Sequence, residues 1–262
     1  MAFKPIPLPG GSRYPVVCAP LVGRTREALV IEAAAVAAKA PDLLEWRVDF
    51  YDEVADADAV LATARALRAA AGGCPILFTR RSSREGGQPI VASEEQVVAV
   101  YDAICRSRLV DLVDFEMDND ARHLEAVREM CRAAQLPLLL SFHDFNATPS
   151  HDVLVARFQN AQALGADVAK LAVMPRSMDD VLTLLAATLS ASRRCEVPVV
   201  SMAMGGLGAV TRMCGSAFGS AMTFAVGQDA SAPGQMPIAE IGAAVDMLRR
   251  AMGVQPGDAA GA

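Results

Sequence analysis

Short apolar runs alternate with amphipathic helical patterns along almost the whole chain. Eight of these runs have the length and the Val, Leu and aromatic content of buried strands. They lie at residues 14–21, 43–50, 75–81, 109–118, 137–145, the run around Lys170, 197–204 and 221–226. Between them, apolar residues recur three or four positions apart, which predicts helices. The predicted helices lie at residues 25–40, 56–71, 93–106, 120–134, 151–164, 177–194, 213–220 and 237–252.

The regular alternation of strand and helix favours one architecture. The units repeat about every 30 residues with short connections, which is typical of βα units. The sequence therefore predicts an α/β protein, a (β/α)8 TIM barrel forming a single domain over residues 1–262. Within it, residues 1–13 form an N-terminal extension and residues 253–262 a frayed tail. An open doubly wound sheet is the competing topology, but no GxGxxG motif follows the first run.

Polar side chains interrupt the strands near their carboxyl ends. In a barrel of this kind the site is built from those ends and from the loops that follow them. The polar residues at that end are Glu45, Arg47, Arg81, Glu116, His143, Lys170 and Arg212. Side chains alternate along a strand, so Arg81 is expected to face inward, whereas Arg80 and Arg84 are expected outside the pocket. The distribution predicts one central pocket.

Lys170 is the most informative of these residues. The chain has three lysines, and only this one lies inside an apolar run. A buried ammonium group is costly, and a desolvated lysine loses its proton more readily and can attack a carbonyl to form an imine. From the residue alone, a pocket or ion-pair lysine without covalent chemistry remains an alternative.

Composition narrows the class of protein. Hydrophobic residues make up 53% of the chain, charged residues make up 21%, and the net charge is −6. These values describe a soluble acidic protein and imply no nucleic-acid partner. The amino terminus lacks an apolar signal core, and no run approaches the roughly 18 apolar residues of a membrane span. We therefore expect a cytoplasmic protein without a membrane partner.

The candidate chemistry needs no added group. Six cysteines are scattered without a CxxC pair, only three histidines are present, and no phosphate-binding Walker loop occurs. We expect free thiols, no metal and no cofactor, because an imine-forming lysine supplies its own electron sink. Three arginines near one lysine predict a strongly electropositive cavity for an anionic, oxygen-rich molecule such as a carboxylate.

Several motifs together resemble type I 3-dehydroquinate dehydratase (3-dehydroquinase), and the resemblance extends over nearly the whole chain. They are Glu45-Trp46-Arg47-Val48-Asp49, Arg81 with Glu85-Gly86-Gly87, Ser141-Phe142-His143-Asp144-Phe145, Gly165-Ala166-Asp167, Lys170-Leu171-Ala172-Val173-Met174-Pro175, Phe218-Gly219-Ser220 and Ser231-Ala232-Pro233-Gly234-Gln235. The resemblance implies a barrel enzyme of the shikimate or quinate routes, and it leaves open which of the two this chain serves.

The resemblance also implies catalytic roles. Lys170 forms a Schiff base with the C3 ketone of 3-dehydroquinate. His143 takes the C2 proton and then protonates the departing C1 hydroxyl, giving syn loss of water and 3-dehydroshikimate. Glu85 aligns with a carboxylate that orients the histidine ring.

The remaining implied residues bind substrate. Arg212 holds the substrate carboxylate, and the other contacts come from Glu45, Arg47, Arg81, Ser231, Gln235, Met204 and Phe224. The loop Gly227 to Met236 is a candidate lid. The resemblance further implies a homodimer. Departures from the family pattern are Pro20 in place of a serine, Phe142 in place of a polar residue, and the Gly-Gly-Leu-Gly turn at 205–208.

Two other functions compete with this interpretation. A class I aldolase or transaldolase-like barrel also uses a strand lysine and an imine, but it breaks a carbon–carbon bond. A catalytically silent barrel that binds a metabolite is the second alternative, and the three departures from the family pattern make it conceivable. Lys170 and His143 argue against a silent barrel.

Overall fold

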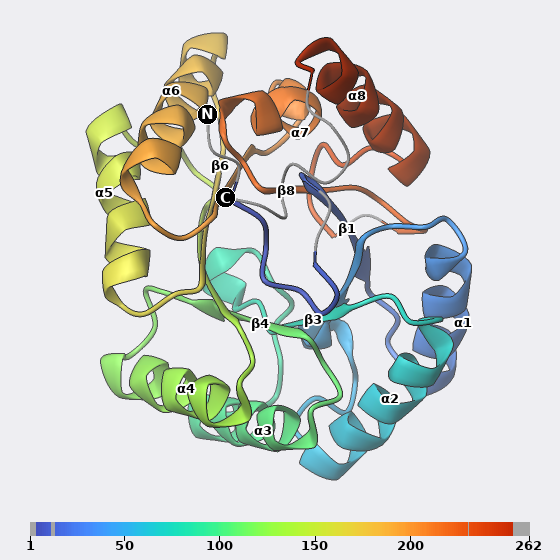
Figure 1. Ribbon diagram of the computed structural model, residues 1–262. Helices are drawn as coiled ribbons and strands as arrows, with labels where there is room; N and C mark the ends of the chain where they lie inside the picture. The colour runs from blue at the N-terminus through green and yellow to red at the C-terminus, as the bar shows by residue number, and fades with distance from the viewer. Residues whose placement is uncertain (1–3, 12–13, 230, 254–262) are drawn as a thin grey trace.

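Eight parallel strands, with helices outside them, form the centre of the protein in the computed structural model, which describes residues 4–11, 14–229 and 231–253 (Figure 1). The strands are β1 (Val16–Leu21), β2 (Leu43–Arg47), β3 (Ile76–Thr79), β4 (Leu112–Glu116), β5 (Leu138–Asp144), β6 (Val168–Val173), β7 (Val199–Ala203) and β8 (Met222–Phe224). The helices are α1 (Arg26–Ala37), α2 (Ala57–Ala70), α3 (Glu94–Ser107), α4 (Ala121–Ala134), α5 (His151–Ala163), α6 (Met178–Arg194), α7 (Ala209–Cys214) and α8 (Ile238–Ala251). The predicted TIM-barrel fold is confirmed.

Some predicted boundaries are wrong. The second strand was expected to reach residue 50, but β2 ends at Arg47 and a 3-10 turn occupies Val48–Phe50. Helix α7 begins at Ala209 rather than at residue 213. It starts directly after the glycine turn because the hydroxyl of Thr211 donates to the carbonyl of Gly208 at 2.7 Å. Periodicity could not detect a helix this short. The expected frayed tail lies outside the described residues, except for Gly253.

The sheet closes into a barrel at one narrow seam. Strand order runs from β7 through β6, β5, β4, β3, β2 and β1 to β8, and all pairs are parallel. Between β7 and β8, the Ala221 amide donates to the Val199 carbonyl at 2.8 Å, and the Ser201 amide donates to the Ser220 hydroxyl at 3.0 Å. A side-chain oxygen thus completes the ladder where the three-residue β8 is too short to do so.

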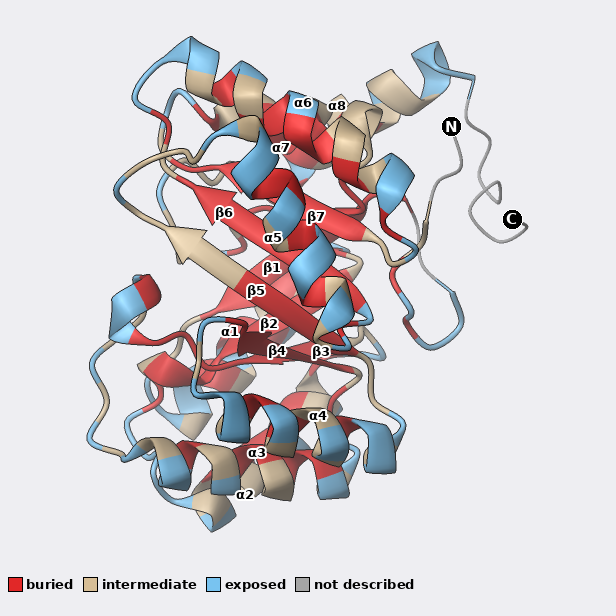
Figure 2. Ribbon diagram, turned by 90° about the vertical axis from the view of Figure 1, so that its left-hand side faces the viewer, coloured by how far each residue is buried: buried red, intermediate tan, exposed pale blue. Residues whose placement is uncertain are grey.

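Apolar side chains pack on both faces of the strands, in an outer and an inner layer. The outer layer fills the space between sheet and helices, and Figure 2 shows the helices buried on the side that faces the sheet and exposed on the other. The inner layer fills the interior of the barrel. Its members from the strands include Leu43, Leu77, Leu112, Leu139, Val168 and Val200, and Ile6 and Leu8 from the N-terminal segment pack in the same cluster. The outward- and inward-facing positions alternate as a strand requires.

Above this inner layer the barrel interior becomes polar. On each strand from β2 to β6, the next inward-facing residue lies two positions further along and is polar. In strand order these residues are Glu45, Thr79, Asp114, Ser141 and Lys170. All five are buried. The barrel therefore has an apolar floor, and a polar, charged level lies over it at the carboxyl side.

No helix in the described part of the chain is both long enough and apolar enough to span a bilayer.

A chain of aromatic rings joins strands β2, β3 and β4 to helix α3. The ring centroids of Trp46 and Phe78 are 5.5 Å apart, those of Phe78 and Tyr101 are 5.3 Å apart, and those of Tyr101 and Phe115 are 5.2 Å apart. All three pairs pack edge to face. Tyr101 also donates its hydroxyl to the carbonyl of Asp114 at 2.8 Å. The rings fix the backbone of the strands whose inward side carries the polar level.

We predict that Phe78→Ala lowers the free energy of unfolding by about 3–5 kcal/mol, because it opens a cavity between two fully buried rings. Urea unfolding followed by circular dichroism measures the change. The control is Val91→Ala, whose side chain is 98% exposed and whose removal should have almost no effect. A loss below about 1 kcal/mol for Phe78→Ala would show that the aromatic chain is not tightly packed.

Candidate active site

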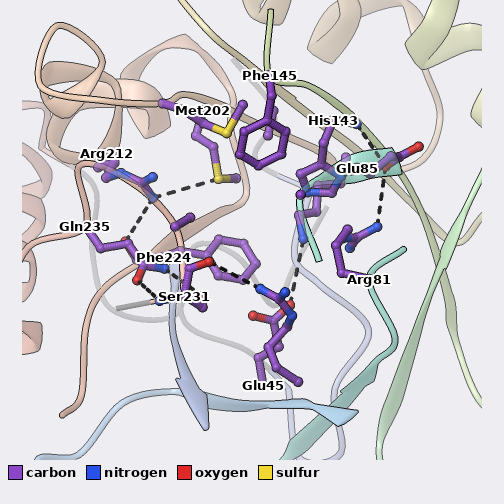
Figure 3. Close-up of a pocket in the computed structure, with 16 residues that line it drawn as sticks. Glu45, Arg81, Glu85, His143, Phe145, Met202, Arg212, Phe224, Ser231 and Gln235 are labelled. Carbon is purple, nitrogen blue, oxygen red and sulfur yellow. Dashed lines mark hydrogen bonds and ion pairs between the residues drawn. The ribbon is translucent and has the colours of Figure 1, made fainter. Parts of the chain in front are cut away.

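A cavity with about 460 Å³ of empty space, part of it open to solvent, lies above the polar level. All of the predicted site residues line it, namely Lys170, His143, Glu85, Glu45, Arg47, Arg81, Met204, Arg212, Phe224, Ser231 and Gln235. Figure 3 shows these side chains converging from opposite sides of the barrel. Glu116, which the polar pattern also placed at this end of the barrel, does not line the cavity. The role of each lining residue is a separate question.

Lys170 projects into the barrel from the middle of β6 and is only 3% exposed. Its Nζ lies 3.1 Å from Asp114 Oδ2 and 3.9 Å from Glu45 Oε1. It also lies 4.5 Å from the centre of the Phe224 ring. The amine is therefore held between a carboxylate and an aromatic face, and both interactions fix its position.

Asp114 is the centre of the charged level. It is fully buried and does not line the cavity, but it contacts Lys170 and accepts two bonds from Arg81 Nη2 at 2.8 Å each. The Ser141 hydroxyl donates to Asp114 Oδ1 at 2.6 Å. Burial alone would raise the pKa of Asp114, but the charges of Arg81 and Lys170 lower it to about 2. Asp114 is thus a carboxylate at neutral pH.

Arg81 connects this carboxylate to the cavity wall. Its Nη1 donates to the Ser141 hydroxyl at 2.8 Å and lies 3.5 Å from Glu85 Oε2. Burial alone would lower the pKa of Arg81, but the carboxylates of Asp114 and Glu116 raise it above its usual range. Glu116 itself lies behind Arg81, at 3.4 Å, and does not contact the lysine.

His143 and Glu85 form a second pair beside the lysine. Glu85 Oε2 lies 2.8 Å from His143 Nδ1, and it accepts the backbone amide of His143 at 3.0 Å. The arrangement that satisfies both bonds places a hydrogen on Nδ1, which then donates to the same oxygen. Nε2 is left with its lone pair and can accept a proton from a molecule in the cavity.

Burial favours the neutral form of both members of this pair. Burial lowers the pKa of His143 well below its usual value, and the cations Arg81 and Lys170 lower it further. Burial raises the pKa of Glu85 to about 8, and the nearby Glu116 contributes in the same direction. At neutral pH the imidazole is therefore a free base, and its partner carboxyl retains a proton.

Arg212, from α7, differs from the other cations of the cavity. Its guanidinium is 2% exposed and donates to the carbonyls of Phe224 at 3.3 Å and Pro233 at 3.1 Å. Within the described residues no carboxylate pairs with it, and its Nε has no hydrogen-bond partner. Burial lowers the pKa of Arg212 to about 10, so it is still a cation at neutral pH. An anion in the cavity would find its counter-charge here.

The expected strongly electropositive cavity is wrong. Arg47 is bound by both oxygens of Asp49 at 2.8 Å, as Arg81 is by those of Asp114. Lys170 shares Asp114. Most of the positive charge is therefore compensated inside the protein, and the uncompensated part is localised at Arg212. Alternation put Asp49 on the inner side of a continuing strand, whereas the 3-10 turn after β2 brings it to Arg47.

The loop after β8 covers one side of the cavity with polar side chains. Gln235 Oε1 accepts the backbone amide of Ser231 at 2.9 Å, and Arg47 Nη1 donates to the carbonyl of Ser231 at 3.4 Å. These bonds connect the loop to both its own end and the end of β2. Ala230, within the predicted lid at 227–236, lies outside the described residues.

Five lining residues were not predicted: Gly86, Phe145, Ala172, Met202 and Ala232. Ala172 and Met202 share strand parity with Lys170 and Met204, so alternation could have identified them. Phe145 and Gly86 could not be found in this way because a loop-to-strand contact brings them together. A Cβ at Gly86 would lie 2.2 Å from the Phe145 ring, and the φ of Gly86 is +81°, so a side chain there would displace the ring and strain the backbone.

The departures from the family pattern lie in different places. Phe142 faces away from the cavity, and the guanidinium of Arg157 covers its ring at 3.6 Å. Pro20 is buried opposite Glu45 but does not line the cavity. Arg80 and Arg84 are outside it, as predicted; Arg80 pairs with Glu94. Among the residues that can be described, no cluster of His, Cys, Asp and Glu has the arrangement of a metal site.

Comparison with known proteins identifies the family. A family model described as type I 3-dehydroquinase matches residues 17–252. The 3-dehydroquinate dehydratase of Albidiferax ferrireducens is 49% identical over 247 residues, covering 94% of this chain and 93% of that protein. The one from Shouchella clausii is 50% identical over 249 residues, covering 94% and 97%.

A solved structure agrees with the sequence relatives. The crystal structure of 3-dehydroquinate dehydratase from Geobacillus kaustophilus superposes with a TM-score of 0.89 at 49% identity, and the match covers 92% of this chain and 93% of that one. The family model, the sequence relatives and the barrel all extend over most of the residues. On these grounds the chain belongs to the type I 3-dehydroquinase family.

Proposed function

We propose that the protein dehydrates 3-dehydroquinate to 3-dehydroshikimate through a Schiff base on Lys170, without a cofactor. The observation that carries the proposal is a buried amine and a neutral imidazole opening on one cavity that also contains Arg212. Membership of the type I 3-dehydroquinase family supports both the reaction and its place in the shikimate pathway.

The first step joins the amine to the ketone. An amine attacks a carbonyl through its lone pair, so an ammonium on Lys170 must first lose a proton, and the free-base imidazole of His143 can accept it. Nζ adds to the C3 carbonyl, and the imidazolium of His143 returns the proton to the C3 oxygen. Loss of water from the adduct then gives a protonated imine and leaves the imidazole free again. The positive charge on nitrogen then remains beside the Asp114 carboxylate, which needs no rearrangement to stabilise it.

The second step removes water from the substrate. The iminium acidifies the C2 proton, which His143 Nε2 accepts, and the electron pair of that C–H bond moves toward the imine nitrogen. The imidazolium then gives the proton to the C1 hydroxyl, water leaves, and a C1–C2 double bond forms. Because one side chain performs both transfers, both groups leave from the same face. Hydrolysis of the imine frees Lys170 and the product.

The other cavity residues suit orientation rather than proton transfer. Arg212 binds the carboxylate, since it is the cation without a partner carboxylate in the described residues. Glu45, Arg47 and Arg81, with Ser231 and Gln235, offer hydrogen bonds to the hydroxyls, and Met204 and Phe224 form apolar walls. Glu85 acts through the ring of His143.

We also propose that residues 1–262 work as one barrel domain in a cytoplasmic homodimer, on the strength of the family resemblance. Sedimentation at several protein concentrations tests the assembly. A single species with the mass of one chain at all concentrations would refute the dimer.

We predict that Lys170→Met lowers kcat by about 10³-fold or more, because no imine can form. Borohydride reduction in the presence of 3-dehydroquinate should add the mass of the reduced adduct to the wild-type peptide that contains Lys170, and not to the variant. Lys4→Met is the control and should be trapped like the wild type. An undiminished turnover in Lys170→Met would contradict the mechanism.

We predict that Arg212→Lys raises KM for 3-dehydroquinate about 10- to 100-fold, because lysine cannot bind a carboxylate through two parallel bonds. The methyl ester of the substrate separates charge recognition from a general defect. Wild-type enzyme should discriminate strongly between acid and ester, and the variant much less. The matched control is Arg80→Lys, outside the cavity. Equal discrimination in Arg212→Lys and wild type would place the carboxylate elsewhere.

We predict that the titration of Glu85 makes a contribution to the stability of the wild type that falls as pH rises. The folded state holds this proton up to about pH 8, whereas the unfolded chain loses it near its ordinary value of 4.5. Between these values the folded state binds more protons, so a rise in pH favours unfolding.

Glu85→Gln removes this titration and keeps the shape of the side chain. Between about pH 5.5 and about pH 8.5, the wild type should lose at least ~1 kcal/mol more unfolding free energy than the variant. Urea unfolding at both pH values measures it. Parallel pH dependences of the two proteins would show that Glu85 titrates normally.

A further inference from the structure

The loop after β8 rests on the turn after β7 through two glycines. The Gly205 amide donates to the Pro233 carbonyl at 3.2 Å, and Gly234 lies directly against the Gly205 carbonyl. We call Gly205, Pro233 and Gly234 the loop seat. Both glycines have positive φ angles, +70° for Gly205 and +79° for Gly234. The seat thus joins two segments that are about 30 residues apart in sequence.

No side chain fits at Gly234. A Cβ there would lie 2.3 Å from the Gly205 oxygen and 2.8 Å from its carbonyl carbon. These atoms belong to the backbone, and the same oxygen accepts the Gly208 amide at 3.2 Å, so it is not free to turn away. The contact therefore depends on the absence of a side chain, in addition to the backbone conformation.

The Pro233 carbonyl connects the seat to the substrate-binding arginine. It accepts the Gly205 amide and also Arg212 Nη2, at 3.1 Å. The next residues of the same loop carry Gln235 into the cavity, and Gln235 in turn holds Ser231. One carbonyl thus fixes the loop, the turn and the guanidinium that faces the cavity.

We propose that Gly234 is a positioning residue whose docking on Gly205 holds the loop closed and couples closure to the orientation of Arg212. This inference rests on the proposed function, in which Arg212 binds the substrate carboxylate. When the loop is seated, Pro233 orients the guanidinium while Ser231 and Gln235 cover the cavity. When it is lifted, Arg212 loses one of its two carbonyl acceptors and the cavity opens to water.

The experiment compares substitutions at Gly234 with the same substitutions at Gly73. Gly73 also has a positive φ, +89°, but a Cβ there would meet nothing within 4 Å. Gly234→Ala and Gly73→Ala therefore introduce the same kind of backbone strain, but only Gly234→Ala places a Cβ against the Gly205 backbone. Asparagine adopts positive φ more readily than alanine but still carries a Cβ, so the two Asn variants reduce strain and keep the contact.

We expect Gly234→Ala and Gly234→Asn to lower kcat/KM about 100-fold, mainly through KM, and both Gly73 variants to remain within about twofold of wild type. Hydrogen exchange of the peptide spanning 231–236 should be faster in the Gly234 variants. Recovery of activity in Gly234→Asn would show that glycine serves only the backbone angle, and would overturn the proposal. Unchanged exchange in both Gly234 variants would do so too.

A double-mutant cycle tests the coupling. If the seat acts through Arg212, then Gly234→Ala combined with Arg212→Lys should lose much less than the product of the two single losses. A loss equal to that product would mean that seat and arginine act independently, which overturns the coupling.

Two results separate this inference from the proposed function. Absence of dehydratase activity in the wild type would refute the function, whereas an active Gly234→Ala enzyme would refute only the seat. Thermal melting shows whether each variant folds. If Gly234→Ala fails to fold, exchange and kinetics of Gly234→Asn decide.

Discussion

The contact between Asp114 and Lys170 is the interaction on which the rest of the site depends. An amine in the middle of a barrel needs a counter-charge, and a buried carboxylate needs more than one donor, so Arg81 and Ser141 complete the set. Removing Asp114 would leave two buried cations without the carboxylate that they share. The network therefore holds the Lys170 side chain in one position. The Asp114 carboxylate then remains beside the nitrogen after the amine has lost its proton and formed the imine.

Most charged side chains around the cavity are paired with an opposite charge, so the side chains without such a partner are the informative ones. Arg47 has Asp49 and Arg81 has Asp114, whereas Arg212 has two carbonyl oxygens and the Met202 sulfur as partners and no carboxylate in the described residues. His143 and Glu85 are the opposite case, because neither is charged. Burial lowers the pKa of His143 and raises the pKa of Glu85. The protein thus keeps one free base and one unmatched cation, which suit proton abstraction and carboxylate binding. Carbon–carbon cleavage as in an aldolase is not what the family match supports.

The regular alternation of strands and helices predicted the barrel, and the period-two alternation within each strand predicted which side chains face inward. It placed Lys170 and His143 in one interior and excluded Arg80. It could not give the 3-10 turn that brings Asp49 to Arg47, because a single change in backbone angle ends the alternation. The contacts of Gly86 with Phe145 and of Gly234 with Gly205 also depend on how loops meet in space, which no local pattern encodes.

The chain has a single tryptophan, and its position gives the protein a built-in optical reporter. Trp46 lies between Glu45 and Arg47 on β2, fully buried in the aromatic chain, and its indole nitrogen has no hydrogen-bond partner among the residues that the structure describes. Its fluorescence therefore originates from one known environment, on the outer side of the strand whose inner side lines the cavity. A shift of β2 on ligand capture would change the packing of this indole against Tyr51 and Phe78, so its emission would report that shift without any label.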